Sequence, residues 1–496
     1  MSEQQATSKA QVAEQEDAPK SLMEELLTEA QVQDVDEDAY RIAKRGIEAF
    51  MGELLRGHEK YGKIERAIVD QMISQIDQKI ANQVNEVLHH ATFQQMESTW
   101  RSIRYLVDHS DSRENVKIEL LDITKQCLID DFEDSSDITK SGLYRTVYSA
   151  EYGTFGGHPY GAMITGWEFD AGHEDIRLLQ NLASIAAMAH APLLANASAR
   201  FFGEDDFHEL PRMRDLKALF ESPQYLRWRS FRDSEDSRYV GLCMPRFLLR
   251  VPYDKDHKPV RNFDFTEDVI DQHDHYLWGP ASYALAARCA ESFAAYRWCP
   301  NIIGPLAGGA VEDLPVHQYE AMGTLQTKLP VEIQLTERRE YELSEEGFIG
   351  LTYRKNSDNA AFFSANSCQR PRYYGDTEDG RRNELNFRLG TQLPYMFIIT
   401  RLAHYIKVIQ RENLGSWKTA AELRRELKKW LLGYTSSGPK VDPITKSKRP
   451  FQATEVLVDE VPGQAGWYRC EIQVMPHFKY MGADFTLSLV GKLDKQ

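Results

Sequence analysis

The first quarter of the chain is patterned for helices separated by polar stretches. Residues 1–19 are small, polar and acidic without apolar periodicity, which is typical of a disordered tail. Ser21 is a good N-cap, and the apolar residues that follow it at helical spacing predict a short amphipathic helix: Leu22, Met23, Leu26 and Leu27. The same spacing predicts a second helix from Ile42 to Leu55, and a third from Ile64 past Leu88.

The middle of the chain mixes strand and helix patterns. Val116, Ile118 and Leu120 alternate with polar neighbours and predict a strand over 115–123. Further strands are expected over 161–169 and 239–252, and helices over 175–191 and 282–296. Interleaving of this kind indicates a mixed α/β or α+β fold, and no repeat of fixed period suggests a solenoid or propeller.

The C-terminal part ends in strands. Two helices are expected over 394–415 and 419–434, and the Ser-, Pro-, Lys- and Gly-rich stretch 436–450 predicts an exposed, mobile loop. Strands are then expected over 454–461, 466–475 and 484–493; the apolar positions of the last two are Tyr468, Cys470, Ile472 and Val474, and Phe485, Leu487 and Leu489. The edges of such a small sheet are either blunted or used to pair with another chain.

Composition narrows the classes of function. The 496 residues are 42% apolar and 27% charged, the balance of a folded protein of several domains. A net charge of −16 argues against nucleic acid or an anionic membrane as the main partner. The N-terminus lacks a secretory signal, and the apolar stretch 178–197 is expected to be a buried helix rather than a membrane span. The six cysteines are widely spaced, which predicts free thiols.

Candidate chemistry is weak throughout. The glycines between Gly153 and Gly161 invite a phosphate-binding interpretation and with it a hydrolase or nucleotide-binding enzyme, but the stretch lacks the endings of a P-loop or a dinucleotide motif, and a structural turn is favoured. No histidine falls in a catalytic or zinc motif. We therefore expect no catalytic residue, no cofactor and no metal site.

Two segments keep two interpretations each. The mixed arginines and acids of 227–242 fit a surface loop with weak ion pairs, or else a subunit interface. The amphipathic helix at 21–32 either packs on its own domain or docks in a groove of a partner, because it is short and flanked by polar chain.

Long strings in the chain resemble one family. Among them are YGTFGGHPYGAMI, FFGEDDFHELP, YLRWRSFRDSEDSRYVGL, YRWCPNIIGPLAGGAVEDLPVH and LGTQLPYMFIITRLAHYIKVIQRE. From about Ser21 to its end, the sequence is similar to the TssC/VipB family, the large subunit of the contractile sheath of the type VI secretion system. The resemblance implies a phage-tail-sheath-like fold and a structural, non-enzymatic protein.

The resemblance also implies an organisation and a set of partners. Residues 1–60 would be an N-terminal extension, 61–375 the main sheath region with an outer-surface subdomain, and 376–496 a C-terminal domain at the inner face. The expected partners are the small subunit TssB/VipA, further copies of the chain in a six-fold helical sheath, the Hcp tube and a membrane-anchored baseplate, all in the cytoplasm. Leu22, Met23, Leu26 and Leu27 would bind the ClpV ATPase, and the last two strands would join a sheet shared between subunits.

Overall fold

The computed structural model describes residues 66–255, 258–260, 265–270, 272–321, 323–438, 441–461 and 468–477, together with five positions between 41 and 49. The residues predicted to bind ClpV and those of the last predicted strand lie outside this part. The chain divides into two compact units, Met1–Glu86 with Pro259–Thr266, and Val87–Lys258 with Glu267–Gln496. The first contains most of α4 (Arg66–Leu88), which exposes Ile73, Ile76 and Ile80.

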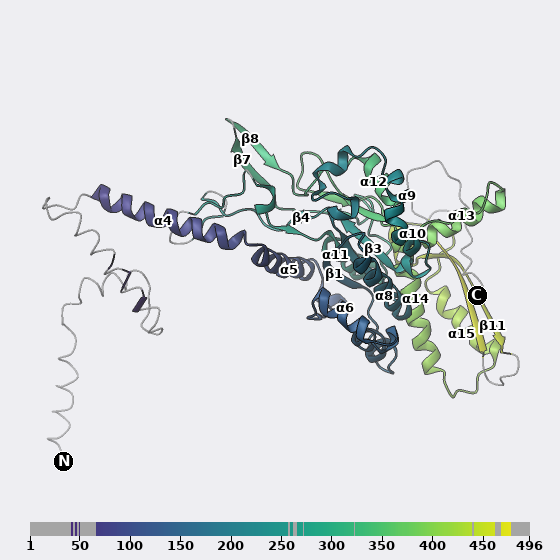
Figure 1. Cartoon of the computed structure of the whole chain (residues 1–496). Coiled ribbons are helices and arrows are strands. Elements are labelled where there is room, and N and C mark those ends of the chain that lie inside the picture. Colours follow the sequence, from purple (N-terminus) through teal and green to yellow (C-terminus); the bar gives the residue numbers. More distant parts are fainter. Residues whose placement is uncertain are drawn as a thin grey trace, which may run out of the picture. The chain divides into compact units, whose positions relative to one another are not determined.

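A six-stranded sheet forms the centre of the second unit (Figure 1). Its strands follow the order β1 (Met163–Phe169), β2 (Leu193–Ala197), β3 (Val240–Met244), β9 (Phe348–Tyr353), β10 (Ala360–Phe362) and β6 (Ala310–Val311). The first four run parallel, with Leu194 beside Gly241 and Cys243 beside Ile349, whereas β10 is antiparallel to both its neighbours. The mixed α/β fold class is confirmed.

The inner strands of the sheet are apolar on both faces because helices cover both faces. Every residue of β2, β3 and β9 is buried, as expected of parallel strands packed on two sides. The edge strand β1 differs, since only Phe169 is buried and its other residues are partly exposed. Burial thus falls from the middle of the sheet toward the edge formed by β1.

Two cores lie on the two faces of the sheet. On one face, α8 (His173–Ala189), α9 (Leu216–Glu221), α10 (Leu226–Arg232) and α12 (Glu337–Glu345) enclose aromatic side chains, with the rings of Phe201 and Trp228 4.7 Å apart. On the other, α11 (Ala281–Tyr296) and α5 (Ala91–Asp108) pack over Leu194 and Ile349. The helices expected over 175–191 and 282–296 are α8 and α11.

A third core belongs to the C-terminal part. It is built by α14 (Leu393–Glu412), α15 (Ala420–Leu432) and the antiparallel pair β11 (Phe451–Glu460) and β12 (Tyr468–Pro476). Leu402, Leu431, Phe451 and Ile472 meet there. Trp298, which follows α11, packs into the same core, with its ring 5.3 Å from that of Tyr434 and 5.9 Å from that of Phe451.

The remaining elements are short or peripheral. The helices are α6 (Lys125–Asp134), α7 (Gly142–Tyr144), a π-helix (Arg145–Tyr152), α13 (Glu378–Gly390) and α16 (Pro443–Lys448). Two small antiparallel pairs are β4 (Phe247–Leu248) with β5 (Trp278–Gly279), and β7 (His317–Ala321) with β8 (Thr324–Lys328). None of the helices in the described part of the chain is long and apolar enough to cross a membrane.

Several predictions are wrong. Residues 115–123 form no strand, although their pattern is that of one. The strand expected over 239–252 is interrupted after Met244, where Pro245 cannot donate to a ladder, so that it gives β3 and β4. The stretch 436–450 contains a helix, α16, whose N-cap Asp442 accepts from the Ile444 amide. Pro443 at the first helical position suits that helix start.

Candidate assembly interface

The predicted face of β12 is an internal packing surface. The side chains of Ile472 and Val474 are buried and Cys470 packs against the same core, whereas Glu471 and Gln473 between them are partly exposed. The predicted alternation of apolar and polar positions along this strand is therefore confirmed. Tyr468, at the start of the strand, is partly exposed and its hydroxyl donates to the Lys418 carbonyl (3.3 Å).

The backbone of β12 has one paired and one unpaired edge in the described part of the chain, whereas its apolar face packs against the C-terminal core. One edge pairs with β11 from Phe451↔Pro476 to Glu460↔Tyr468, while no described residue pairs with the other. The His477 amide donates to the Pro450 carbonyl (2.9 Å), on the side of β11. Because amide directions alternate along a strand, the Ile472 amide points to the unpaired edge. That edge therefore presents backbone N–H and C=O groups with which another strand can pair.

The start of α15, one of the helices behind the hairpin, is capped by side chains. Thr419 caps α15 by accepting from the Glu422 amide (3.4 Å), and the Glu422 carboxylate accepts from the Thr419 amide (2.9 Å). This capping box satisfies two backbone donors that the helix start would otherwise leave open. Lys418, just before the cap, forms an ion pair with Glu426 (2.6 Å).

The arginine-rich segment 227–242 is not a surface loop. It starts in α10, and the guanidinium of Arg232, 4% exposed, donates to Glu346 Oε2 (2.5 Å), the Glu345 carbonyl (2.7 Å) and the Cys368 carbonyl (3.1 Å). A buried ion pair of this kind joins the end of α10 to the turn after α12. The interpretation as a surface loop with weak ion pairs is wrong for Arg232, whose guanidinium is buried and has three fixed acceptors in place of solvent.

The glycine-rich turn is occupied by the chain's own groups. The His158 amide donates to Glu151 Oε2 (2.6 Å), so a carboxylate already takes up a donor that a phosphate would need. A Cβ on Gly157 would collide with the Glu151 backbone, and Gly156 has φ +84°. Arg411 of α14 donates to the carbonyls of Tyr152 (2.6 Å) and Thr154 (3.0 Å). The turn therefore has a structural role, because it connects the end of the π-helix to α14 through Arg411.

Two histidines meet where α8 ends against α14. His190, in the left-handed region (φ +51°), ends α8, and its ring lies 6.3 Å from that of His404. His404 Nε2 donates to the Ala189 carbonyl (3.0 Å). Burial lowers the pKa of His404 to about 4, and it also lowers the pKa of His190, next to Lys407. Both rings are thus neutral parts of the packing.

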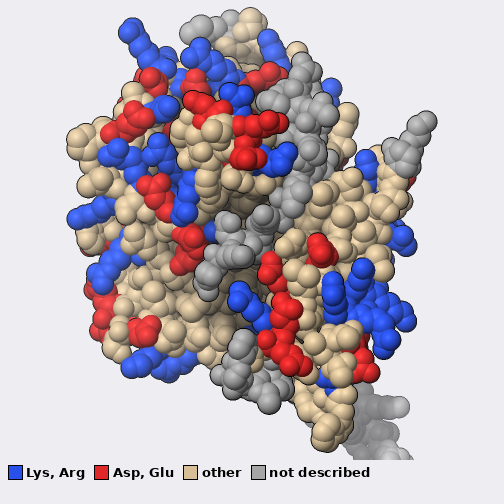
Figure 2. All heavy atoms as spheres, turned by 90° about the vertical axis from the view of Figure 1, so that its right-hand side faces the viewer, with Lys and Arg blue, Asp and Glu red and all other residues tan. Residues whose placement is uncertain are grey.

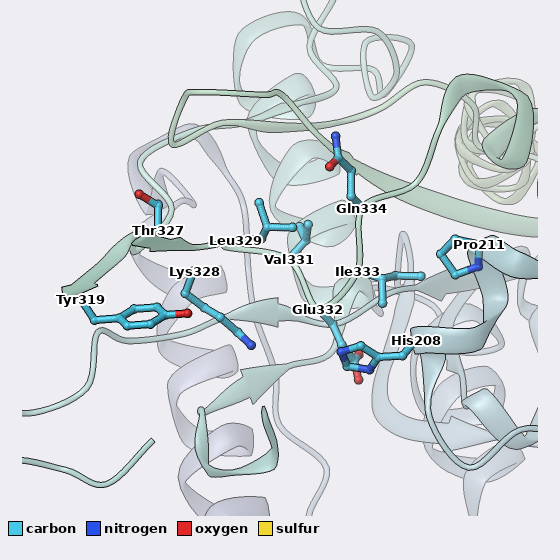
Figure 3. Close-up of a pocket in the computed structure, with 10 residues that line it drawn as sticks. All are labelled: His208, Pro211, Tyr319, Thr327, Lys328, Leu329, Val331, Glu332, Ile333 and Gln334. Atoms are coloured by element: carbon cyan, nitrogen blue, oxygen red, sulfur yellow. The ribbon is translucent and has the colours of Figure 1, made fainter. Parts of the chain in front are cut away.

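One hollow, drawn in Figure 3, carries charged residues without a catalytic pairing. It lies beside the stretch from Thr327 to Gln334, with His208 and Pro211 at one end. Burial alone would raise the pKa of Glu332, but Arg246, bonded to it at 2.5 Å and 2.9 Å, lowers it to about 2. A carboxylate held in this way is a poor general base.

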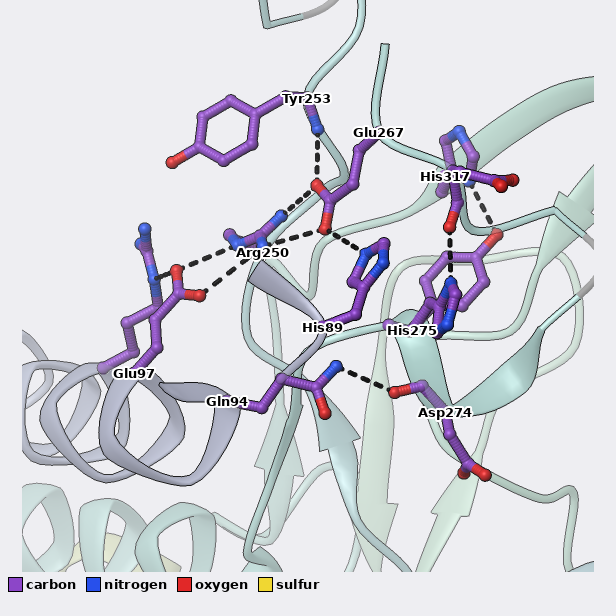
Figure 4. Close-up of polar contacts among 12 residues, drawn as sticks. His89, Gln94, Glu97, Arg250, Tyr253, Glu267, Asp274, His275 and His317 are labelled. Atoms are coloured by element: carbon purple, nitrogen blue, oxygen red, sulfur yellow. Dashed lines mark hydrogen bonds and ion pairs between the residues drawn. The ribbon is translucent and has the colours of Figure 1, made fainter. Parts of the chain in front are cut away.

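A second polar cluster attaches α5 to the body (Figure 4). Arg250 donates to Glu267 (2.6 Å) and to Glu97 of α5 (3.0 Å), and Glu267 also accepts from the Tyr253 amide (3.0 Å). The side chains of Arg250 and Glu267 are 4% and 1% exposed. His89 completes the group, 3.4 Å from Glu267. The groups satisfy one another, which is the pattern of a structural anchor.

The surface and the thiols suggest no other chemistry. On the face seen in Figure 2, basic and acidic side chains are mixed over most of the surface, and a group of basic side chains lies beside a run of acidic ones at the lower right. Among the described residues no three His, Cys, Asp or Glu side chains form a group that could hold a metal. Burial raises the pKa of the Cys299 and Cys368 thiols to about 12, which disfavours a thiolate nucleophile.

Comparison with known proteins assigns the family. Residues 70–369 match the family VipB, described as EvpB/VC_A0108, tail sheath N-terminal domain. Residues 382–493 match VipB_2, described as EvpB/VC_A0108, tail sheath gpW/gp25-like domain. The chain belongs to the VipB family of tail sheath proteins. It is a structural sheath protein, and the family is not an enzyme family.

A relative and two distant structures accompany this assignment. The type VI secretion system sheath protein TssC1 of Pseudomonas aeruginosa is 40% identical over 430 residues, covering 86% of each chain. The contracted sheath complex of an extracellular contractile injection system matches with a TM-score of 0.33 and 9% identity, covering 62% of this chain and 68% of that one. The baseplate of the anti-feeding prophage matches with a TM-score of 0.35 and 9% identity, covering 76% and 83%. The VipB assignment rests on the sequence matches.

Proposed function

We propose that the chain is the large subunit of a type VI sheath that co-assembles with the small subunit TssB/VipA. In this proposal the two subunits build a six-fold helical tube around the Hcp tube, attached to a membrane-anchored baseplate in the cytoplasm, and contraction of the tube propels Hcp outward. The observation that carries it is the 40% identity to TssC1 across 86% of the chain. The resemblance to the family implies that such a chain assembles into a tube together with the small subunit.

The three-part organisation fits this role. We propose an N-terminal extension over 1–60, a main sheath region with an outer-surface subdomain over 61–375, and an inner-face C-terminal domain over 376–496. The two family matches end at 369 and begin at 382, which supports a boundary near 375. Contraction needs no nucleotide site if the energy is stored as a difference between two packings of the same subunits.

Strand sharing between subunits is proposed for the end of the chain. The unpaired edge of β12 supports it, because main-chain hydrogen bonds to that edge fix a register while the flanking linkers stay free to turn. In the proposal, Phe485, Leu487 and Leu489 contribute a further strand to the same intersubunit sheet. Such joints would keep neighbouring subunits connected while the sheath contracts.

Co-expression tests the assembly. With the small subunit present, hollow tubes should be visible by negative-stain electron microscopy, while the chain alone should be poorly soluble. A stable monomer that ignores the small subunit would contradict the proposal.

Recycling is tested separately at the N-terminal helix. Leu26→Asp with Leu27→Asp should abolish ClpV binding in a pull-down while tubes still form, because a charge removes the apolar anchors of a docked helix. If the tubes disappear as well, the helix belongs to the sheath's own packing and the ClpV role is wrong.

A further inference from the structure

One segment of the chain has the sequence of a strand but pairs with no strand among the described residues. After Asn115, in the left-handed region (φ +61°), residues 116–123 lead to α6 without forming a helix or a strand. Residues 117–122 are all exposed, including Ile118 at 36%, Leu120 at 62% and Leu121 at 53%. No backbone hydrogen bond joins 115–123 to any other described residue.

Two side-chain contacts connect the stretch 119–125 with the stretch 160–168, which contains the edge strand β1. The Tyr160 hydroxyl, just before β1, donates to Glu119 Oε2 (2.5 Å). At the other end, the Lys125 ammonium donates to the Glu168 carbonyl of β1 (3.0 Å). Neither contact joins the segment to β1 directly, but their order gives the stretches 119–125 and 160–168 the same direction.

Both backbones are therefore available for pairing. Strand β1 is at the edge of its sheet, with β2 as its neighbour among the described residues. Edge amides and carbonyls are templates for another strand, and apolar groups gathered on an exposed surface mark interaction sites. A β-patterned sequence that has no partner among the described residues gains ladder hydrogen bonds and apolar burial when another chain supplies a strand.

The charge around the segment specifies the partner. Glu119 and Asp122 flank Leu120 and Leu121, and Lys117 is the one base among residues 116–122. The helix that follows, α6, carries four acids: Asp130, Asp131, Glu133 and Asp134. A complementary strand therefore alternates apolar residues with lysine or arginine.

We propose that residues 116–122 are a docking strand that pairs, beside the edge of β1, with an apolar and basic strand of the small sheath subunit. The inference rests on the proposed function, and it names a second joint between the subunits, far along the sequence from the β12 edge. It also gives a reason why the strand predicted over 115–123 is not formed: in this proposal the segment becomes a strand only when the small subunit pairs with it.

Hydrogen exchange of intact tubes tests the pairing. In tubes made by co-expression, every second amide of 117–122 should exchange at least about tenfold more slowly than open-chain amides, because a partner strand on one side forms ladder hydrogen bonds with alternate amides. Tubes in which this segment exchanges at the open-chain rate would overturn the inference and leave the proposed function intact. If the two chains form no tubes, the proposed function fails, and the inference with it.

Cross-linking identifies the occupant. A photo-reactive residue at Leu121 should cross-link to the small subunit in tubes. Cross-linking only to a second copy of this chain would overturn the assignment of the partner.

Matched variants measure the contribution of the apolar side chains. Leu120→Asp with Leu121→Asp should reduce the small subunit recovered with the chain by at least about tenfold, because charges replace groups that are buried in the complex. Leu226→Asp is the control, since Leu226 in α10 is 65% exposed and should leave recovery unchanged. Equal recovery with both variants would contradict the docking strand.

Discussion

The six-stranded sheet and the β11–β12 hairpin use similar residues, but they leave different amounts of backbone unpaired. In the sheet, β2, β3 and β9 have a strand on each side and helices on both faces, and all their residues are buried. In the hairpin, one face packs on α14 and α15 while one edge of β12 has no described neighbour. The comparison separates a region that is complete within the chain from a region that another chain can complete.

The difference has a physical reason. An isolated two-stranded pair is marginal in water, so the hairpin depends on the helices behind it and on whatever pairs with its edge. The sheet draws its stability from buried apolar area and from internal ion pairs such as Arg232 with Glu346. Changes in the sheet should therefore affect folding, and changes at the hairpin edge should affect assembly.

The largest effect on folding is expected at Arg232. Arg232→Ala leaves the carboxylate of Glu346 partly buried without its partner, which should destabilise the chain by about 3–5 kcal/mol. That is a large part of the stability of a typical domain, so the variant should be largely insoluble even with the small subunit. Arg227→Ala, at an exposed position of the same helix, should leave soluble yield unchanged. Normal yield of the Arg232 variant would refute the buried role.

A proline in β12 should separate assembly from folding. Ile472→Pro removes the amide that points to the unpaired edge, and tubes should be lost in negative-stain images. Ile472→Val keeps that amide and most of the buried side chain, and should cost about 0.5–1.5 kcal/mol without loss of tubes. Tubes formed normally by the proline variant would show that this edge is not used.

Acid should weaken the contact between α8 and α14. The folded-state pKa of His404 is about 4, below the value of about 6.5 for an unfolded histidine. Its stabilising effect is therefore complete above pH 6.5 and is lost as pH falls toward 4, by an amount on the order of 3 kcal/mol. Thermal unfolding of tubes between pH 7 and pH 4.5 measures the loss.

His404→Phe should flatten this pH dependence, because the ring can no longer be protonated. The residual slope reports the other groups that titrate in this range, among them His89, His190 and His477, whose pKa values are also lowered by burial. His173→Gln, at an exposed position in α8, should keep the wild-type slope. An unchanged slope in the His404 variant would assign the acid sensitivity to other groups.

The smallest effect is expected at the start of α15. Thr419→Ala removes one half of the capping box and should destabilise the C-terminal part by about 1 kcal/mol, seen as a lower unfolding temperature. Glu422→Gln retains a side chain that can accept from the Thr419 amide and should have a smaller effect. A larger loss for Glu422→Gln would indicate that its charge, rather than the cap, supports the helix.

The sequence was sufficient wherever one pattern decides one element. The apolar periods of α8, α11, α14 and α15 and the alternation of β12 predicted those elements within a few residues. The failures have two causes. Arg232 reads as a surface charge because its partner Glu346 is 114 residues away, and no local pattern records such a pair.

The other cause is that an alternating pattern indicates that a segment can form a strand, but it does not identify the strand with which the segment pairs. Residues 115–123 have the alternation of a strand, but a strand needs a neighbour that this chain does not supply among its described residues. The assembly residues were predicted from the family resemblance more than from their physics. For β12 the structure adds a distinction that alternation could not give, between a buried face and a free edge.

Trp298 gives the two regions a mechanical connection. Its ring sits in the C-terminal core against Tyr434 and Phe451, while its backbone directly continues from α11, which lies on the sheet. A pull on the hairpin therefore reaches the sheet through tightly packed rings as well as along the covalent chain. Close packing of this ring resists relative movement of the two regions, so we expect a force on the hairpin to be transmitted to the sheet.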